Sequence, residues 1–495
     1  MADERVNSRG VTERIFISGR LELQTPAHFG NGDSGAKTDM PLLRDGFDVT
    51  RPLLTGASIA GALRNYLREY EKGYGVAESQ NGQSRAEQLF GHLRGNQGDE
   101  NPASVESWLM VDDALGEAPD AGAWRVELRD GVAIDAKSRT AEINEKGKGF
   151  KYDIELLAAG TVFPLGFELW RNETNADLLE SLALALKGLE EGRIGLGMRK
   201  RRGYGEVKVT GWRVWRYSLN TTAGLLGWLN HDPGQGGMSG DDILSLLEVT
   251  PTLKHQGTAF SVKAEFHLEN SLLIRQEGGS SSADMAHLRS WRGEVERPIL
   301  SGTSLAGVIR GRALRIANTL NQDKGETLVN EMFGRRIRHA NDEASGSRVV
   351  VQETVIENGI EERIQNRVKL DRFTGGAYPQ ALFSQKPVWG KGSGEVTTVR
   401  VHLALRKPEN GLPEQRFQAS VGLLLLVLKD LWLTDLPLGG ESSVGRGRVC
   451  GHCATLTLGD KTWTLTQEGE KLTVLGSSQT ELEQFVVALH QELKP

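Results

Sequence analysis

The sequence is poor in cysteine and in long apolar runs, and it has no excess of positive charge. Two cysteines in 495 residues are too few for a disulfide framework and predict a reducing, cytoplasmic setting. The charged N-terminus carries no apolar signal segment, and the most apolar run, 421–428, is far shorter than the ~20 residues of a membrane span, so we expect no membrane contact. A net charge of −6 excludes a generally basic nucleic-acid coat, so any polyanion must bind at a focused patch.

Glycine, in contrast, is abundant, with 60 residues, and many of these glycines lie in segments that recur. Residues 51–64 read RPLLTGASIAGALR and residues 297–310 read RPILSGTSLAGVIR, at an offset of 246 (297 − 51). A Phe-Gly dipeptide and a glycine-rich turn recur at offsets of 243 (334 − 91) and 242 (445 − 203). Because order and spacing are both preserved, we predict two tandem copies of one domain.

Each copy is predicted to follow the order β-α-β-β-α-β. Apolar residues alternate along 260–268, as in a half-buried strand, and take helical spacing after each repeated segment, where Ser58 and Ser304 are placed to cap the helix. Second helices are expected over 177–189 and 421–431, each followed by a glycine-rich turn and a strand. The order predicts an α+β protein of two ferredoxin-like or RRM-like domains, in which two helices cover one face of an antiparallel sheet.

The predicted domain organisation has four regions. The first domain covers 1–217, a linker with a short helix covers 218–257, and the second domain covers 258–458. The remaining residues, 459–495, have the patterns of a hairpin and an amphipathic closing helix.

The turn GLGMRKRRGYG, residues 195–205, is the strongest candidate for a phosphate site. Glycines allow close backbone approach and consecutive cations attract phosphate, so the predicted RNA contacts here are Arg199, Lys200, Arg201, Arg202, Gly203 and Tyr204. The turn follows a helix and lacks a Gly-Lys-Ser/Thr ending, so it is neither a Rossmann loop nor a P-loop; a solvated basic turn is the alternative. Its duplicate, 438–448, keeps the glycines but has lost most of the cations, which predicts phosphate binding mainly through backbone groups, or weaker binding.

The repeated Pro-x-x-x-Gly-x-Ser-x-x-Gly-x-x-Arg segment, the Phe-Gly dipeptide and the late glycine-rich loop resemble the RAMP superfamily of CRISPR effector subunits. Each copy resembles the backbone subunits of type III complexes, and two fused copies are similar to the double backbone subunit of type III-D systems. The resemblance covers about 14–215 and 258–457. Further expected RNA contacts in the recurring motifs are Ser58, Arg64, Ser304, Arg310, Ser443 and Arg446.

The resemblance also selects catalytic residues. The family's catalytic aspartate lies in the loop after the first strand, which matches Asp39 in TDMPLLRD (38–45); ADMAHLRS (283–290) keeps the Asp-Met pair at Asp284 but lacks the proline. The resemblance implies metal-dependent RNA cleavage, with Mg²⁺ or Mn²⁺ at Asp39 and Asp284, that leaves a 2′,3′-cyclic phosphate and a 5′-hydroxyl. The alternatives within the first loop are Asp33, Asp45 and Asp48, or a merely solvated Asp39.

A second recurring element, 129–137 and 366–374, resembles the start of the thumb that wedges between guide and target in related subunits. The thumb hairpins are expected over 138–150 and 375–388, while Asp135 and Asp371 are expected to cap turns rather than to catalyse. Cys450 and Cys453 face opposite sides of a regular strand, and no other cysteine completes a zinc set, so we do not expect a zinc site.

The favoured interpretation is a backbone subunit that binds guide crRNA and cleaves complementary target RNA at one site per domain. Its partners would be guide crRNA, target RNA, a large polymerase-like subunit, and further backbone and small subunits. The alternatives are a non-catalytic crRNA-binding backbone and a guide-processing endoribonuclease that uses a histidine such as His28, which has no counterpart in copy two.

Overall fold

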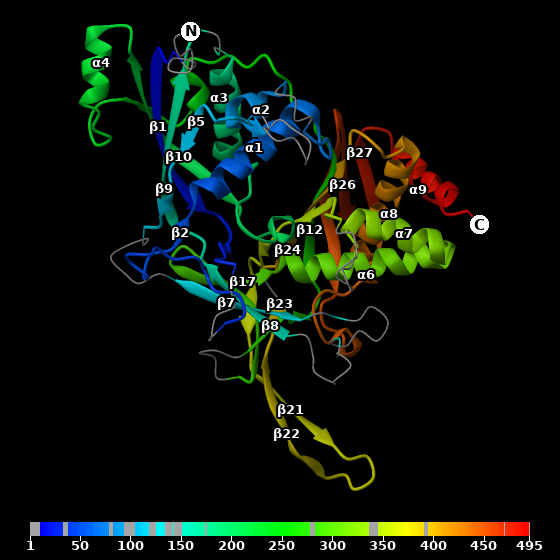
Figure 1. Cartoon of the computed structure of the whole chain (residues 1–495). Coiled ribbons are helices and arrows are strands. Elements are labelled where there is room, and N and C mark those ends of the chain that lie inside the picture. The colour runs from blue at the N-terminus through cyan, green and yellow to red at the C-terminus, as the bar shows by residue number, and fades with distance from the viewer. Residues whose placement is uncertain are drawn as a thin grey trace, which may run out of the picture. The chain divides into compact units, whose positions relative to one another are not determined.

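The structure is a computed structural model (Figure 1) that describes residues 10–32, 38–78, 83–93, 104–117, 125–132, 134, 142, 151–173, 175, 177–277, 283–335, 345–390, 395–469 and 471–494. The chain forms two compact units. Unit 1 comprises Met1–Leu128, Ile154–Met198 and Gly205–Gly257, and unit 2 comprises Arg129–Asp153, Arg199–Tyr204 and Thr258–Pro495. Two segments of copy one, 129–153 and 199–204, are therefore part of unit 2.

Unit 1 is built on an antiparallel sheet in the order β11-β10-β1-β9-β5. Its strands are β1 (Glu13–Leu23), β5 (Leu109–Val111), β9 (Val162–Arg171), β10 (Val207–Ser218) and β11 (Met238–Gly240). Ile15, Ile17 and Leu21 of the central strand β1 are buried in one core with the apolar faces of α1 (Gly56–Lys72) and α3 (Leu178–Glu190). The shorter elements are α2 (Arg85–Phe90), α4 (Thr222–Leu229), α5 (Ile243–Leu246), β2 (Leu53–Leu54), β3 (His92–Leu93), β4 (Ser104–Val105) and β6 (Ala114–Leu115).

Unit 2 repeats this plan. Its main sheet has the order β18-β24-β12-β25-β26-β27, in which β25-β12-β24-β18 corresponds to β10-β1-β9-β5 of unit 1. The strands are β12 (Thr258–Leu268), β18 (Val349–Val351), β24 (Thr398–Lys407), β25 (Val449–Leu458), β26 (Lys461–Glu468) and β27 (Lys471–Gly476). Phe260, Val262 and Phe266 of β12 are buried in one core with α6 (Gly302–Leu320) and α8 (Glu414–Trp432). The two sheets with their helices make the chain a mixed α+β protein, as predicted.

The two principal repeat helices begin earlier than the sequence suggests. The N-cap of α1 is Thr55, whose side chain accepts a hydrogen bond from the Ser58 N–H, and the N-cap of α6 is Ser301. Ser58 and Ser304 therefore lie within the first turn of each helix, and the prediction that they are the caps is wrong. Thr55 and Ser301 have the extended backbone of an N-cap (φ −71°, ψ 143° and φ −66°, ψ 129°). The helical backbone begins at the next residues, Gly56 and Gly302.

The C-terminal residues complete the core of unit 2. The β26–β27 hairpin extends the sheet beyond β25, and α9 (Gln479–Glu492) packs on α8. The two helices approach closely at Gly422, where an added Cβ would lie 2.1 Å from the Phe485 carbonyl oxygen. The remaining elements of unit 2 are α7 (Gln322–Phe333), β13 (Ser271–Leu272), β14 (Arg275–Glu277), β15 (Met285–His287), β16 (Arg289–Arg292), β17 (Val295–Leu300), β19 (Thr354–Val355), β20 (Ile360–Glu362) and β23 (Val388–Gly390).

Two further strand pairs lie outside the two main sheets. One joins β7 (Val126–Val132) and β8 (Lys151–Leu157), and the other joins β21 (Gln365–Leu370) and β22 (Ala377–Lys386). Figure 1 shows the β21–β22 hairpin projecting well away from the β12-centred sheet of unit 2. No helix in the described part of the chain combines the length and apolar character needed to cross a bilayer.

Candidate nucleic-acid interface and cleavage loops

The loop that carries Asp39 is fastened to β8 by one carboxylate. Glu155 Oε1 accepts a hydrogen bond from the Thr38 hydroxyl at 3.1 Å, and Oε2 accepts one from the Leu42 N–H at 3.1 Å. The Arg44 guanidinium lies 3.8 Å from the same Oε2. No local sequence pattern marks Glu155, because its partners lie more than 100 residues earlier in the chain.

Asp39 is exposed and immediately precedes Met40, which pairs in parallel with Ile154 of β8. Two of the alternative catalytic aspartates accept hydrogen bonds that stabilise a turn. Asp45 Oδ2 accepts a hydrogen bond from the Asp48 N–H at 3.1 Å, and Asp48 Oδ1 accepts hydrogen bonds from the Thr50 hydroxyl and N–H. The Thr50 side chain, then its backbone N–H, lower the pKa of Asp48. Asp33 lies outside the described residues.

His28 is a structural residue. It is 6% exposed, and its Nδ1 lies 2.8 Å from the backbone oxygen of Glu155. The His28 carbonyl accepts the Met198 N–H at 3.1 Å, so this segment also supports the start of the glycine-rich turn. A buried imidazole held in this way is poorly placed to exchange protons with an RNA at the surface.

Asp284 occupies the corresponding place in copy two. It is exposed and precedes Met285, which pairs in parallel with Gln385 of β22. Its Oδ2 accepts hydrogen bonds from the Ser384 N–H at 2.7 Å and the Ser384 hydroxyl at 2.9 Å. The backbone hydrogen bond from Ser384, followed by the one from its side chain, lowers the pKa of Asp284.

The two aspartates thus share one arrangement. Each precedes a methionine that pairs in parallel with the returning strand of an inserted hairpin, β8 for Asp39 and β22 for Asp284. The missing proline at Ala286 does not remove this pairing, which includes Ala286 itself opposite Lys386.

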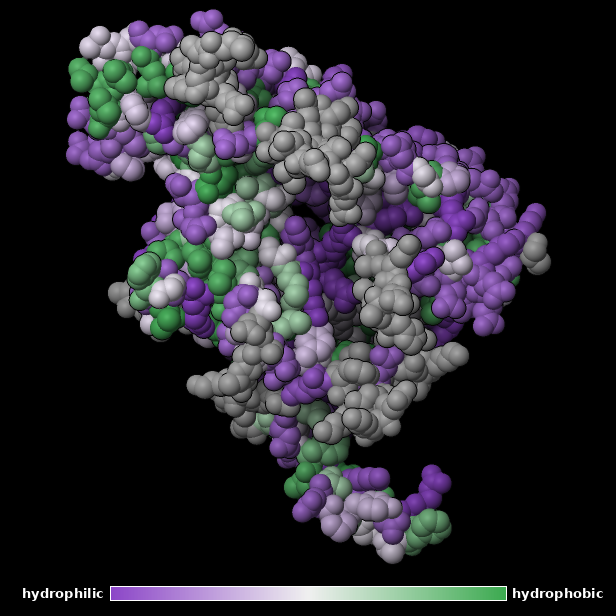
Figure 2. All heavy atoms as spheres, viewed as in Figure 1, coloured by the Kyte–Doolittle hydropathy of each residue, from purple (hydrophilic) through white to green (hydrophobic). Residues whose placement is uncertain are grey.

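The β21–β22 hairpin exposes apolar side chains that no core covers. Phe373 is 96% exposed, Leu382 is 72% exposed and Leu370 is 61% exposed. Figure 2 shows hydrophobic residues among hydrophilic ones along this projection. At its tip Asp371 accepts hydrogen bonds from the Phe373 N–H and the Thr374 hydroxyl, as expected of a turn cap. The other expected thumb, residues 138–150, lies outside the described residues except for Glu142. Asp135 also lies outside them.

The glycine-rich turn has the same backbone in both copies. The Leu196 N–H donates to the Gly205 carbonyl and the Leu438 N–H to the Gly447 carbonyl, each at 2.8 Å. A short 3₁₀ turn follows a left-handed residue in each, Lys200–Arg202 after Arg199 (φ 57°) and Ser442–Val444 after Glu441 (φ 61°).

The side chains of the basic turn differ in exposure. Lys200 and Arg202 are exposed, whereas Arg199 donates to the Tyr152 hydroxyl and Arg201 Nη1 donates to the Ser347 carbonyl at 2.6 Å. Tyr204 is only 3% exposed, so its ring stacks on no base in this conformation. Gly203 is also buried. It packs so closely on the backbone at Glu353 that an added Cβ would lie 2.2 Å from the Glu353 nitrogen. The expected RNA contacts by Gly203 and Tyr204 thus fall on two buried residues.

In copy two, an acidic residue takes the place of Arg199. Glu441 has Arg367 Nη1 and Arg275 Nη2 at 3.1 Å and Arg446 Nε at 3.0 Å. Burial opposes its charge, but the Gln385 amide and these arginines outweigh burial and lower the pKa of Glu441. Arg446, an expected RNA contact, is 2% exposed and forms an ion pair with Glu441, whereas Ser443 is exposed. The offset of 242 (441 − 199) could have revealed this charge reversal in the sequence.

The repeated helices present small residues to solvent near their N-termini. Ser58 and Gly61 of α1 are exposed, as is Gly307 of α6, and Ser304 is half-buried. In unit 1 this surface borders a groove of about 350 Å³ that includes Gly56, Ala57, Gly61 and Arg64.

The arginines of the repeated motif have protein partners. Arg64 forms a bidentate ion pair with Glu78, at 2.8 and 2.6 Å, and Arg310 donates to Asn330 Oδ1 at 2.8 Å. The hydrogen bond from Arg64 to Glu78 raises the pKa of Arg64. An RNA phosphate would have to share or displace these partners.

The family model of the RAMP superfamily matches residues 20–208 and 266–450, well over half of the chain. The chain belongs to the RAMP superfamily. No curated protein matches it. The two matched regions contain the two repeats, so this is a double RAMP protein, and RAMP membership indicates a CRISPR-associated, RNA-binding function. Both aspartate loops and both glycine-rich turns lie inside the matched regions.

Proposed function

We propose that this RAMP protein is a double backbone subunit of a type III CRISPR effector complex, which binds guide crRNA and cleaves the paired target RNA at Asp39 and Asp284. Each copy would be a ferredoxin-like domain, and the shared strand order of the two sheets supports this. The β21–β22 hairpin would act as a thumb between guide and target. Its exposed apolar side chains suit contact with unstacked bases.

The observation that carries the proposal is the equivalent placement of the two aspartates. Each aspartate precedes the same kind of parallel pairing in both copies, which supports a role that the two domains share. Each aspartate is exposed, and each adjoins the strand that returns from an inserted hairpin. A nucleotide distorted by that hairpin would therefore meet a carboxylate.

The proposed chemistry uses the RNA's own 2′-hydroxyl as nucleophile. The oxygen attacks the adjacent phosphorus, the bond to the 5′-oxygen of the next nucleotide breaks, and that oxygen takes up a proton from water, which leaves a 2′,3′-cyclic phosphate and a 5′-hydroxyl. Asp39 or Asp284 would orient the hydroxyl and accept its proton. In copy two, Ser384 would hold the carboxylate in place through Oδ2, leaving Oδ1 toward the substrate.

A divalent ion fits these loops only with help from the RNA. Among the described residues, no group of three metal-ligating side chains includes Asp39 or Asp284. Mg²⁺ and similar ions commonly combine one or two carboxylates with water and substrate phosphates, and one aspartate per loop suits that mode. Such an ion would neutralise charge that develops on the phosphate.

The experiment maps cuts in end-labelled target RNA with the assembled complex. Asp39→Asn is expected to remove one cut and Asp284→Asn the other, each by 10²–10⁴-fold in rate, while guide binding is retained. Asp45→Asn, in the same loop as Asp39, is the matched control and should leave both cuts. Cutting at both positions by the double variant would overturn the catalytic assignment.

Two alternatives give different results in the same preparation. A non-catalytic backbone would bind guide and target but cut nowhere, with or without Mg²⁺ or Mn²⁺. A guide-processing enzyme would cut repeat RNA in a His28-dependent way, which the buried position of His28 disfavours.

A further inference from the structure

The open face of the main sheet in unit 2 carries an irregularity at His452. Glu265 of β12 pairs with Cys453 of β25, but Phe266 pairs with Gly451, so His452 is an extra residue in β25. Such a β-bulge turns neighbouring side chains to one side of a strand. Gly451 faces α8, where an added Cβ would lie 2.0 Å from the Trp432 ring, while His452 and Cys453 are both at least partly exposed.

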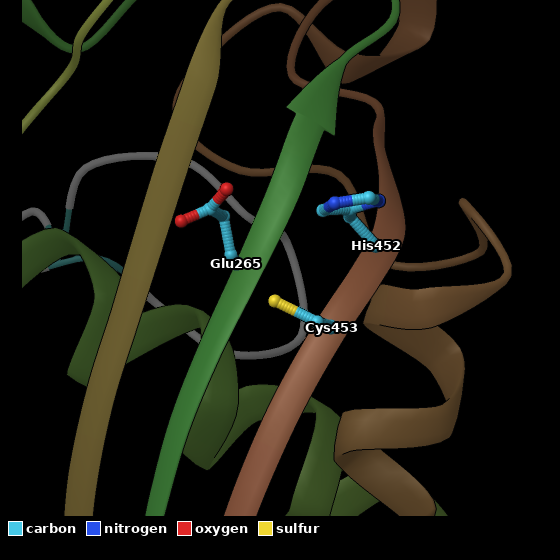
Figure 3. Close-up of side chains that lie close together, drawn as sticks. All are labelled: Glu265, His452 and Cys453. Atoms are coloured by element: carbon cyan, nitrogen blue, oxygen red, sulfur yellow. The ribbon is translucent and has the colours of Figure 1, made fainter. Parts of the chain in front are cut away.

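The bulge brings three metal-ligating side chains together. One ligand atom each from Glu265, His452 and Cys453 lie within 4.8 Å of one another, and Figure 3 shows the three side chains over neighbouring strands. Ligand atoms on a tetrahedral zinc ion are about 3.5 Å apart, given Zn–S and Zn–N bonds of about 2.3 and 2.0 Å. Small side-chain rotations would bring the three ligand atoms from separations of up to 4.8 Å to the distance that zinc requires.

The charge around the cluster suits a divalent cation. Arg400 Nε lies 3.3 Å from Glu265 Oε2, and the same guanidinium also pairs with Glu357. One positive charge thus faces two carboxylates, and a Cys453 thiolate would leave two negative charges in excess. A carboxylate has two oxygens, so Glu265 can keep Arg400 on one and hold a cation with the other.

The histidine is also held in place. The His452 ring stacks on the His267 ring, with centroids 4.5 Å apart and planes 23° apart. Neither the His452 imidazole nor the Cys453 thiol has a hydrogen-bond partner among the described residues. Both side chains can therefore bind a metal ion without giving up a hydrogen bond.

We propose that Glu265, His452 and Cys453 form a binding site for one zinc-type divalent ion, with the fourth position open to water or to a ligand. Thiolate and imidazole favour Zn²⁺ over Mg²⁺ or Ca²⁺, which prefer all-oxygen sites. The site does not depend on the proposed RNA cleavage. The sequence-based objection to a zinc site concerned Cys450 and Cys453 together on a regular strand. The proposed site does not use Cys450, and combines Cys453 with His452 and Glu265.

The test is titration of the full-length, metal-free chain with Co²⁺, followed by competition with Zn²⁺. We expect one Co²⁺ per chain, with the d–d absorption of a tetrahedral site and a sulfur-to-cobalt charge-transfer band, both removed by equimolar Zn²⁺. Cys453→Ser should abolish the charge-transfer band, and His452→Ala should weaken binding on the order of 100-fold or more, since loss of even an outer-shell partner costs about 10–100-fold.

The second cysteine supplies the matched control. Cys450→Ser should leave stoichiometry, band and affinity unchanged, because its thiol lies outside the three-residue group. The Asp39→Asn/Asp284→Asn double variant should also bind Co²⁺ unchanged, which separates this site from any ion used in cleavage. A purely octahedral spectrum, a band that survives in Cys453→Ser, or loss of the band in Cys450→Ser would overturn the assignment.

Discussion

At the residue scale, single carboxylates connect segments that are distant in sequence. Glu155 fastens the Asp39 loop to β8, Glu353 pairs with Arg129 and Arg292, and Glu180 joins α3 to the approach to β12. Removing a carboxylate from water is costly, so each depends on several hydrogen bonds or ion pairs. Substitution of these residues is therefore expected to affect stability as well as function.

Glu180 is expected to make the free energy of unfolding depend on pH. Burial alone would raise its pKa, but hydrogen bonds from Thr252, Arg85 and Leu253 outweigh burial and lower the pKa from 4.5 to about 2. A depressed carboxyl pKa contributes stability above about pH 4.5, and this contribution is lost as the pH falls toward 2. Glu180→Gln should lower the free energy of unfolding by on the order of 3 kcal/mol at pH 7.

Urea unfolding of both proteins between pH 7 and pH 3 checks this prediction. The difference between wild type and Glu180→Gln should shrink to less than half by pH 3, because more than half of the wild-type advantage is lost by that pH. Glu22→Gln, at an exposed position of β1, is the control and should change stability by no more than ~0.5 kcal/mol. A difference independent of pH would contradict the assigned hydrogen bonds.

Ser384 is expected to position Asp284, if Asp284 acts in cleavage. Ser384→Ala removes the hydroxyl that donates to Oδ2, so the pKa of Asp284 should rise toward its ordinary value. The acid limb of the rate of the Asp284-dependent cut should then move to higher pH, while the Asp39-dependent cut keeps its profile. Equal pH profiles for wild type and Ser384→Ala would contradict a positioning role.

At the element scale, the β21–β22 hairpin can be shortened without disturbing Ser384. Val368 lies opposite Leu382, so residues 369–381 can be replaced by Asn-Gly as a two-residue turn. Because the deleted apolar side chains are exposed, the free energy of unfolding should change by no more than ~0.5 kcal/mol. Guide binding should persist and the Asp284-dependent cut should be lost; unchanged cutting would show that the hairpin is peripheral.

Substitutions in the basic turn can distinguish RNA contact from structural support. Lys200→Ala with Arg202→Ala removes exposed cations, and each lost phosphate contact should flatten the log-affinity versus log-salt slope by about 0.7, or about 1.4 for both. Arg199→Ala with Arg201→Ala should instead lower stability, because it removes the bonds to Tyr152 and Ser347. Filter binding at several salt concentrations measures the slope, and Ser443→Ala is the uncharged control. An unchanged slope in the Lys200→Ala/Arg202→Ala variant would mean that the turn is only solvated and does not contact RNA.

At the scale of the whole molecule, duplication made the architecture predictable. The recurring segments predicted two domains of one element order, and the two sheets have matching strand orders. Long-range electrostatic partners were not predictable, because Glu155, Glu353 and Ser384 each contact residues roughly 60 to 220 positions away. Irregular backbone was equally hidden: the bulge at His452 and the caps at Thr55 and Ser301 depend on register and not on composition.

Unit 2 includes more than the second repeat. Arg129, from copy one, lies 3.2 Å from Glu353, and their side chains are 4% and 0% exposed. Arg292 occupies the other oxygen of Glu353 at 2.8 Å. Removing one partner of a buried ion pair typically costs about 3–5 kcal/mol, since it leaves charge without compensation.

Loss of the Arg129–Glu353 ion pair should loosen unit 2 around Glu353. In the full chain, Arg129→Met should reduce the protection of amides in 349–355 against hydrogen exchange by on the order of 100-fold, equivalent to about 3 kcal/mol. Arg363→Met is the control: its ion pair with Glu361 is exposed (69% and 42%) and should contribute less than ~1 kcal/mol. The fragment 258–495, which lacks both inserted segments of copy one, should protect these amides no better than Arg129→Met does. Protection in the fragment equal to that in the full chain would mean that the second repeat folds autonomously and that residues 129–153 and 199–204 add nothing to its core.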